Sequence, residues 1–136
     1  MDIRKVDDTF AVAPQIQASD MQTLADAGYT TVMCNRPDDE EPSQPPLSEI
    51  VAAAKAAGLE FHHVPVSGGM FPQEALEEFA RVRKESPGPV LAYCRSGTRC
   101  MTMEALANPM GLSVDERLER AAEAGYDLSG MRSFLS

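Results

Sequence analysis

The sequence predicts an α/β fold in which a central, mostly parallel sheet of about four strands carries helices on both faces. Short apolar runs rich in strand-forming residues alternate along the chain with segments whose apolar residues recur at helical spacing. The runs are apolar throughout, which is typical of strands buried on both sides of a parallel sheet. A chain of 136 residues can bury such a core as one domain, residues 1–136.

The elements are expected in the following order. Strands are predicted at residues 10–16, 30–34, 60–66 and 89–93. Helices are predicted at residues 19–28, 47–57, 72–83, 101–107 and 113–124. Ser19 and Gln22 have the spacing of a capping box at the start of the first helix, and Ser113 and Glu116 have it at the start of the last. The tail, residues 127–136, contains apolar residues that can dock on the core.

Composition and charge exclude several classes of function. The net charge of −9 argues against nucleic acid or an anionic membrane as a partner. No apolar run is long enough to span a membrane, and the first residues include no apolar export segment. We therefore expect a cytoplasmic protein whose three cysteines are reduced. No His/Cys cluster has the spacing of metal ligands, so neither a metal nor another cofactor is expected.

One short stretch, residues 94–100, concentrates the side chains that can carry chemistry. Cys94 follows the apolar run 89–93 and precedes a predicted helix, so it is expected at a strand-to-helix turn. The first N–H groups of a helix have no partner within it and attract anions. The same field, together with Arg95 and Arg99, favours the thiolate form of a cysteine. Gly97 permits the backbone to curl around an anion.

These features predict a small local pocket that combines an anion-binding loop with a nucleophile. We expect Cys94 and Arg99 to be the catalytic residues. The residues expected to bind the anion are Arg95, Ser96, Gly97, Thr98, Cys100 and, from a second loop, Arg36. The alternative is that Cys94 is a small buried hydrophobe without chemistry.

A second loop, residues 35–46, carries an acidic run directly after a predicted strand. Loops at the carboxyl ends of parallel strands line the ligand crevice, so this loop is expected to lie over Cys94. The groups that would then give or take a proton are Asp38, Asp39, Glu40, Glu41 and His63. The alternatives are a solvated acidic surface and a histidine with a structural role.

The segment Cys94-Arg95-Ser96-Gly97-Thr98-Arg99 resembles the active-site loops of two families, the cysteine-dependent phosphatases of the tyrosine and dual-specificity type and the rhodanese sulfurtransferases. Its arginine stands five positions after the cysteine, as in many rhodaneses, whereas the phosphatase signature has six. The order of elements resembles a small dual-specificity phosphatase, because two helices follow the loop and no strand does. Nearly the whole chain is similar to the bacterial phosphatase-like family that is also found fused to beta-lactamase-like hydrolases, through this loop and through Asn35-Arg36-Pro37-Asp38.

The resemblance implies hydrolysis of a phosphomonoester, from a small anionic substrate or a phosphoprotein, through a phosphocysteine. It also implies a general-acid aspartate after Val64-Pro65-Val66, where this chain has Ser67-Gly68-Gly69. The acid would then come from the candidates named above. Two alternatives remain open: a rhodanese-like sulfurtransferase that carries a persulfide on Cys94, and a non-catalytic module that binds an anion or partner, or senses oxidants, with Cys34 or Cys100 resolving a sulfenate on Cys94.

Overall fold

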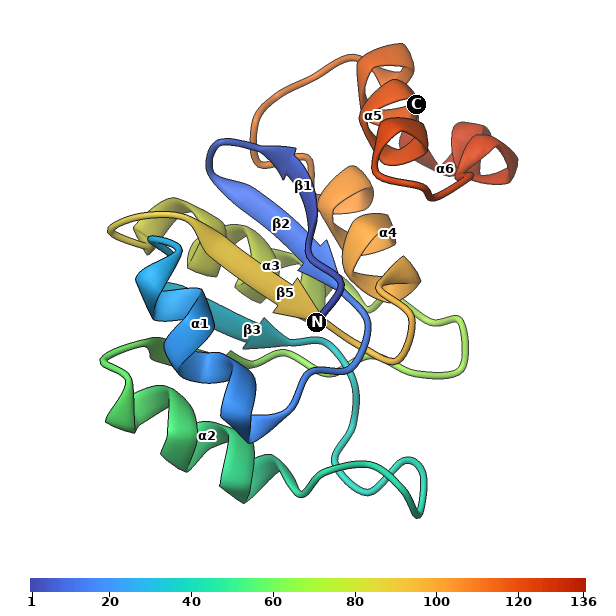
Figure 1. The fold of residues 1–136 in the computed structure, drawn as a ribbon. Coiled ribbons are helices and arrows are strands. Elements are labelled where there is room, and N and C mark those ends of the chain that lie inside the picture. The colour runs from blue at the N-terminus through green and yellow to red at the C-terminus, as the bar shows by residue number, and fades with distance from the viewer.

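The structure, a computed structural model, describes all 136 residues and contains one five-stranded sheet in the order β1-β2-β5-β3-β4 (Figure 1). The strands are β1 (Arg4–Asp7), β2 (Phe10–Ala13), β3 (Thr31–Cys34), β4 (Glu60–His63) and β5 (Val90–Tyr93). β1 pairs with β2 in an antiparallel hairpin, and the other three pairings are parallel. The mostly parallel sheet predicted from the sequence is thus confirmed, with five strands rather than about four.

Helices cover both faces of the sheet, with α1 and α2 on one side and α3 and α4 on the other (Figure 1). The helices are α1 (Met21–Asp26), α2 (Leu47–Ala56), α3 (Gln73–Glu85), α4 (Thr98–Ala107), α5 (Val114–Glu123) and α6 (Arg132–Leu135). Short 3₁₀ turns precede α1 at Ala18–Asp20 and α6 at Ser129–Met131. No helix combines the length and apolar character needed to cross a bilayer.

Several predicted boundaries were wrong for identifiable reasons. β1 was missed because three of its four residues are charged and it is half exposed. β2 and β4 end earlier than predicted, one residue before Pro14 and two residues before Pro65, since proline has no N–H for a sheet hydrogen bond. Ser19 does not cap α1, because Gln17 and Asp20 form the capping box of the 3₁₀ turn instead. The capping box of Ser113 and Glu116 is confirmed.

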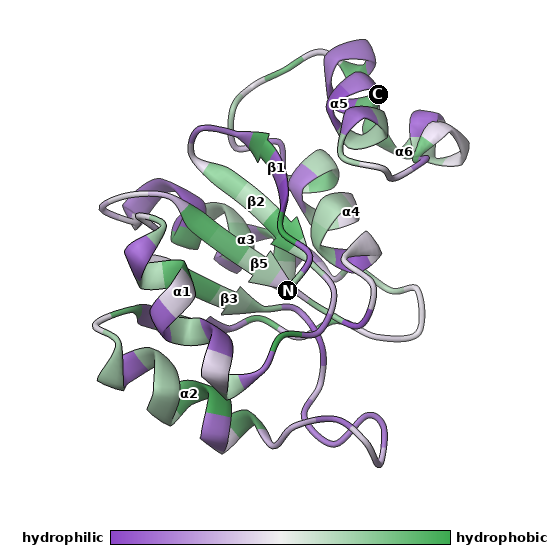
Figure 2. Cartoon of the chain, viewed as in Figure 1, coloured by the Kyte–Doolittle hydropathy of each residue, from purple (hydrophilic) through white to green (hydrophobic).

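The three inner strands are buried along their whole length and separate two apolar cores. Figure 2 shows these strands as hydrophobic ribbons, while hydrophilic residues lie along the helices and in the loop that follows β3. Side chains alternate between the faces of a strand, so neighbours in β5 belong to different cores. Ala92 packs with α3 and α4, whereas Leu91 packs with α1 and α2.

The carboxyl ends of β2, β5 and β3 meet at one edge of the sheet, and the loops that follow them are joined by backbone hydrogen bonds. The N–H of Gln15 donates to the carbonyl of Arg95 at 3.2 Å, and the N–H of Asn35 donates to Tyr93 at 2.8 Å. The loop that begins at Cys94 therefore lies between its two neighbours, as expected for a parallel sheet.

A buried ion pair ties α3 to α4 near the opposite edge of the sheet, beside the start of β2. The Nε and Nη2 atoms of Arg83 donate to the two carboxylate oxygens of Glu104 at 2.7 and 2.8 Å. The guanidinium also lies over the ring of Phe10, 4.5 Å from its centroid, and its side chain is 3% exposed. Removing one member of such a pair leaves the other charge buried without compensation.

We therefore expect Arg83→Ala to lower the free energy of unfolding by about 3–5 kcal/mol in urea titrations. The matched control is Arg81→Ala on the same helix, because Arg81 pairs with Glu78 at an exposed position and is expected to cost less than about 1 kcal/mol. Equal losses in the two variants would contradict a special role for the buried pair.

Candidate active site

Cys94 stands where β5 ends and the loop into α4 begins. Gly97 is the N-cap of α4 and has a φ of 94°, a left-handed conformation that glycine adopts without strain. This turn brings the N–H of Gly97 back toward the start of the loop, where it donates to the Cys94 sulfur at 3.1 Å. The strand-to-helix placement predicted for Cys94 is confirmed.

The surroundings of Cys94 stabilise its thiolate. A hydrogen bond from the Cys100 thiol, assisted by the N–H groups of Cys100, Gly97 and Arg99, outweighs burial and lowers the pKa of Cys94 to about 5. Burial raises the pKa of Cys100, so that this neighbour keeps its proton and remains a donor. At neutral pH, Cys94 is therefore held as a thiolate.

Further donors lie in the same loop. The N–H groups of Arg95 and Ser96 donate to no acceptor within the protein. The N–H of Thr98, in contrast, donates to the Ser96 hydroxyl oxygen at 3.3 Å. The same Ser96 hydroxyl donates to the Thr98 hydroxyl at 3.0 Å. The loop thus presents unused main-chain donors of the kind that bind an oxyanion.

Arg99 is held by a carboxylate from the acidic loop. Its Nη1 and Nη2 atoms donate to the two oxygens of Glu40 at 2.9 and 2.8 Å, and Nη1 also donates to the carbonyl of Val66 at 2.9 Å. The hydrogen bonds from Arg99 lower the pKa of Glu40, so that it remains a carboxylate. The fork of the guanidinium that would suit two phosphate oxygens is occupied by Glu40.

Arg36 is a buried side chain that binds two carboxylates of the acidic loop. Its side chain is 2% exposed and donates to Gln15 at 2.9 Å, Glu40 at 3.1 Å and Glu41 at 2.9 Å. Glu41 also pairs with the exposed Arg95 at 3.2 Å. Arg36 therefore supports the carboxylates and has no exposed surface of its own to offer an anion.

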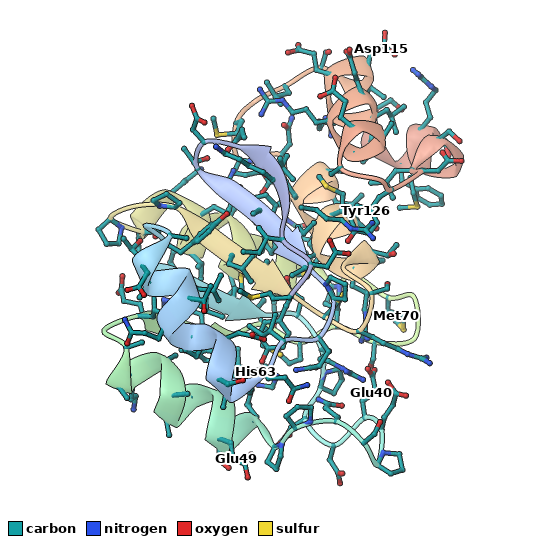
Figure 3. All side chains as sticks on the ribbon, viewed as in Figure 1. Glu40, Glu49, His63, Met70, Asp115 and Tyr126 are labelled. Atoms are coloured by element: carbon teal, nitrogen blue, oxygen red, sulfur yellow. The ribbon has the colours of Figure 1, made fainter.

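The pocket expected over Cys94 is closed in this arrangement, because Cys94 has an exposed fraction of 0%. Figure 3 shows Glu40 on the loop after β3, at the edge where the strands end. The predicted overhang of the acidic loop is present, and it is pinned there by Arg36 and Arg99. A substrate or reagent can therefore reach the sulfur only when the surroundings of Cys94 open.

The other candidate proton donors lie elsewhere. Asp38 accepts from the N–H of Leu47 at 3.0 Å and so caps the start of α2. Asp39 is exposed and its carboxylate accepts no hydrogen bond. The ring of His63 contacts the carbonyl of Arg36 at 2.8 Å, on the outer side of the loop. The structure does not bring these three side chains to Cys94.

An open groove of ≈ 420 Å³ lies beside the Val66 carbonyl that binds Arg99. Its walls include Pro37, Pro65, His63 and the exposed Met70, which Figure 3 places at the same edge as Glu40. Within the whole chain, no group of three or more His, Cys, Asp or Glu side chains is placed to hold a metal ion.

Two residues that contact the site, Gln15 and Tyr126, are not among those expected from the sequence. Gln15 anchors Arg36, and the Tyr126 hydroxyl donates to the Ser96 carbonyl at 3.0 Å. Neither has a motif around it. The only signal for Tyr126 was Gly125, which ends α5 and turns the chain back toward the sheet.

Comparison with known proteins identifies the family. The model of the phosphatase-like domain of beta-lactamase hydrolase-like proteins matches residues 2–111. The chain belongs to this family. A beta-lactamase hydrolase-like protein of Agrobacterium fabrum (strain C58) is 32% identical over 137 residues, which cover 96% of this chain and 31% of that protein. The phosphatase-like domain described here thus spans about a third of the length of that relative.

Solved structures share the fold. The crystal structure of a candidate phosphatase from Neisseria meningitidis Z2491 matches with a TM-score of 0.87 and 38% identity, over 100% of this chain and 97% of that chain. Tk-PTP in its active form matches with a TM-score of 0.73 and 21% identity, over 98% and 92% of the two chains. The phosphatase-like domain therefore has the architecture of protein-tyrosine-phosphatase-like enzymes, and the family resemblance found in the sequence is confirmed.

The low pKa of Cys94 predicts how its reactivity depends on pH. We expect the alkylation rate of Cys94 by iodoacetamide to rise with pH and level off, with a midpoint at about 5, because the thiolate is the reactive form. Trypsin cleaves after Arg95 and Arg99, so mass spectrometry measures Cys94 and Cys100 on separate peptides.

Two variants sharpen this measurement. Cys100→Ala removes the thiol donor and is expected to raise the midpoint, whereas Cys34→Ala removes a thiol that hydrogen-bonds with the Arg36 carbonyl and with Tyr93 and is expected to leave the midpoint in place. A wild-type midpoint near that of a free cysteine, at about 8.5, would contradict the described environment.

Proposed function

We propose that the domain is a cysteine-dependent phosphatase that hydrolyses a phosphomonoester, in a small molecule or a phosphoprotein, through a phosphocysteine on Cys94. The supporting observation is the Cys94 thiolate itself, which faces the N–H groups of its own loop and lies beside a guanidinium. The thiolate attacks phosphorus, an S–P bond forms, and the P–O bond to the leaving group breaks. Water then attacks phosphorus, which releases inorganic phosphate and returns the thiolate.

The anion site uses Arg99 and the unused N–H groups of Arg95 and Ser96. Donors fixed before the reaction stabilise the charge that develops on the phosphoryl oxygens. Glu40 now takes up both Nη atoms of Arg99. A phosphate dianion that binds Arg99 with both of these atoms must therefore displace Glu40, and substrate binding competes with this ion pair.

Glu41 is the carboxylate best placed to protonate the leaving oxygen. All of its contacts with Arg36 and Arg95 use Oε1, and Oε2 accepts no hydrogen bond. Oε2 is therefore the oxygen of this carboxyl that no arginine binds, and Arg95 beside it is exposed. Both oxygens of Glu40, in contrast, are bound by arginine. The loop at Ser67-Gly68-Gly69 offers no acid in its place.

The first test is hydrolysis of p-nitrophenyl phosphate. We expect Cys94→Ser to abolish phosphate release, since a serine hydroxyl at this position is not ionised near neutral pH, while tungstate binding persists. Cys34→Ser, a matched change of a buried thiol outside the loop, is expected to retain activity. Full turnover by Cys94→Ser would contradict the mechanism. Formation of thiocyanate from thiosulfate and cyanide, without phosphate release, would favour a sulfurtransferase. Tungstate binding without turnover in either assay would favour a non-catalytic binding module.

The second test separates the two glutamates. Glu40→Gln is expected to lower KM for aryl and alkyl phosphates by about two- to fivefold, the factor that matches ~0.5–1 kcal/mol for a part-exposed ion pair. Glu41→Gln is expected to lower kcat for an alkyl phosphate by about 10²- to 10⁴-fold and to affect the better p-nitrophenyl leaving group much less.

Asp39→Asn, on the same loop but without contact to the arginines, serves as the control and should leave both parameters unchanged. An unchanged KM in Glu40→Gln would contradict the competition for Arg99. A loss in Glu41→Gln that does not depend on the leaving group would contradict its role as the acid.

A further inference from the structure

Tyr126 contacts the Cys94 loop from outside the elements that form it. It follows α5, and its hydroxyl donates to the carbonyl oxygen of Ser96 at 3.0 Å. The side chain is buried, with 6% of the residue exposed. In Figure 3 it lies beside α4, between the sheet edge and the C-terminal helices. Burial raises the pKa of Tyr126, so that the hydroxyl keeps its proton and donates.

The carbonyl that accepts this bond belongs to the peptide unit whose other end faces Cys94. The Ser96 carbonyl and the Gly97 N–H share one planar, trans peptide, so they point in opposite directions. The Gly97 N–H donates to the Cys94 sulfur at 3.1 Å. Fixing the carbonyl toward Tyr126 therefore fixes the N–H toward the thiolate.

Close packing makes this orientation specific. A Cβ atom on Gly97 would collide with the Tyr126 hydroxyl, and the φ of 94° at Gly97 also disfavours any side chain. Two constraints, steric and conformational, thus require glycine next to this tyrosine. The peptide cannot turn over without breaking the bond to Tyr126 and the bond to Cys94 together.

The end of α5 delivers Tyr126 to the loop. The N–H of Tyr126 donates to Ala121 at 2.8 Å and the N–H of Gly125 donates to Ala122 at 2.9 Å, which is the hydrogen-bond pattern of a Schellman motif. The guanidinium of Arg4, on β1, lies over the tyrosine ring at 4.9 Å from its centroid. The hydrogen bonds at the end of α5 and the contact with Arg4 therefore both fix the position of the Tyr126 ring.

We propose that Tyr126 is a positioning residue that aims the Ser96–Gly97 peptide at Cys94 and so maintains the nucleophile and the anion-binding shape of the loop. The proposal rests on the phosphatase function proposed above for its catalytic consequence, but not for its effect on the cysteine. Tyr126 lies outside residues 2–111, which the family model matches. The proposal therefore assigns a role in the site to a residue beyond that match.

The test is Tyr126→Phe, which keeps the ring and its contact with Arg4 and removes only the hydroxyl. The pH midpoint of Cys94 alkylation is expected to rise by about 0.5–1 and kcat/KM for p-nitrophenyl phosphate to fall by about five- to tenfold, the scale of one lost hydrogen bond. Tyr29→Phe is the matched control. Tyr29 precedes β3, at the opposite edge of the sheet, and should change neither quantity.

A midpoint in Tyr126→Phe equal to that in Tyr29→Phe, with both proteins folded by circular dichroism, would overturn the proposal. The Gly97 amide proton provides a second measurement, because its NMR shift should move in Tyr126→Phe as the bond to sulfur lengthens; an unmoved shift counts against the proposal as well. Alkylation and NMR need no turnover. If the wild-type domain released no phosphate, the phosphatase proposal would fail while these readouts still tested Tyr126.

Discussion

The site depends on the stabilisation of one buried thiolate by donors that the fold points at it. Burial alone would favour the neutral thiol, so the Cys100 thiol and the loop N–H groups must more than offset the cost of desolvation. These donors converge because a strand ends at Cys94, a left-handed glycine follows, and α4 begins at once. The two cores pack against both faces of that strand, and the buried pair of Arg83 and Glu104 joins α4 to α3.

Around this thiolate, the arginines are balanced by carboxylates of the same chain. Glu40 and Glu41 bind the guanidinium groups that would attract a phosphate, and the Cys94 sulfur beside them has no exposed surface. In a chain with a net charge of −9, the basic groups of the site are thus paired with carboxylates, and the proposed function requires an anion that competes for them. A dianionic phosphate, which offers more charge and more acceptor oxygens than a carboxylate, is such a competitor.

The sequence predicted the architecture and the loop well, because both depend on local signals. Buried strands, helix caps and the run from Cys94 to Arg99 can be recognised from neighbouring residues alone. β1 was not predicted because its residues are mostly charged and it joins the sheet only through a hairpin with β2. The pairing of Glu40 with Arg99 spans 59 positions, and the bond from Tyr126 to Ser96 spans 30. Such contacts follow from the folded geometry, since no local pattern in the chain specifies them.

The most direct measurement is a crystal structure of the domain with tungstate, a tetrahedral oxyanion, at the Cys94 loop. The expected result is an ion within hydrogen-bonding distance of the Arg95 and Ser96 N–H groups, with both Nη atoms of Arg99 on its oxygens and the Glu40 carboxylate moved away. A structure in which saturating tungstate leaves Glu40 on Arg99 and the sulfur covered would contradict it.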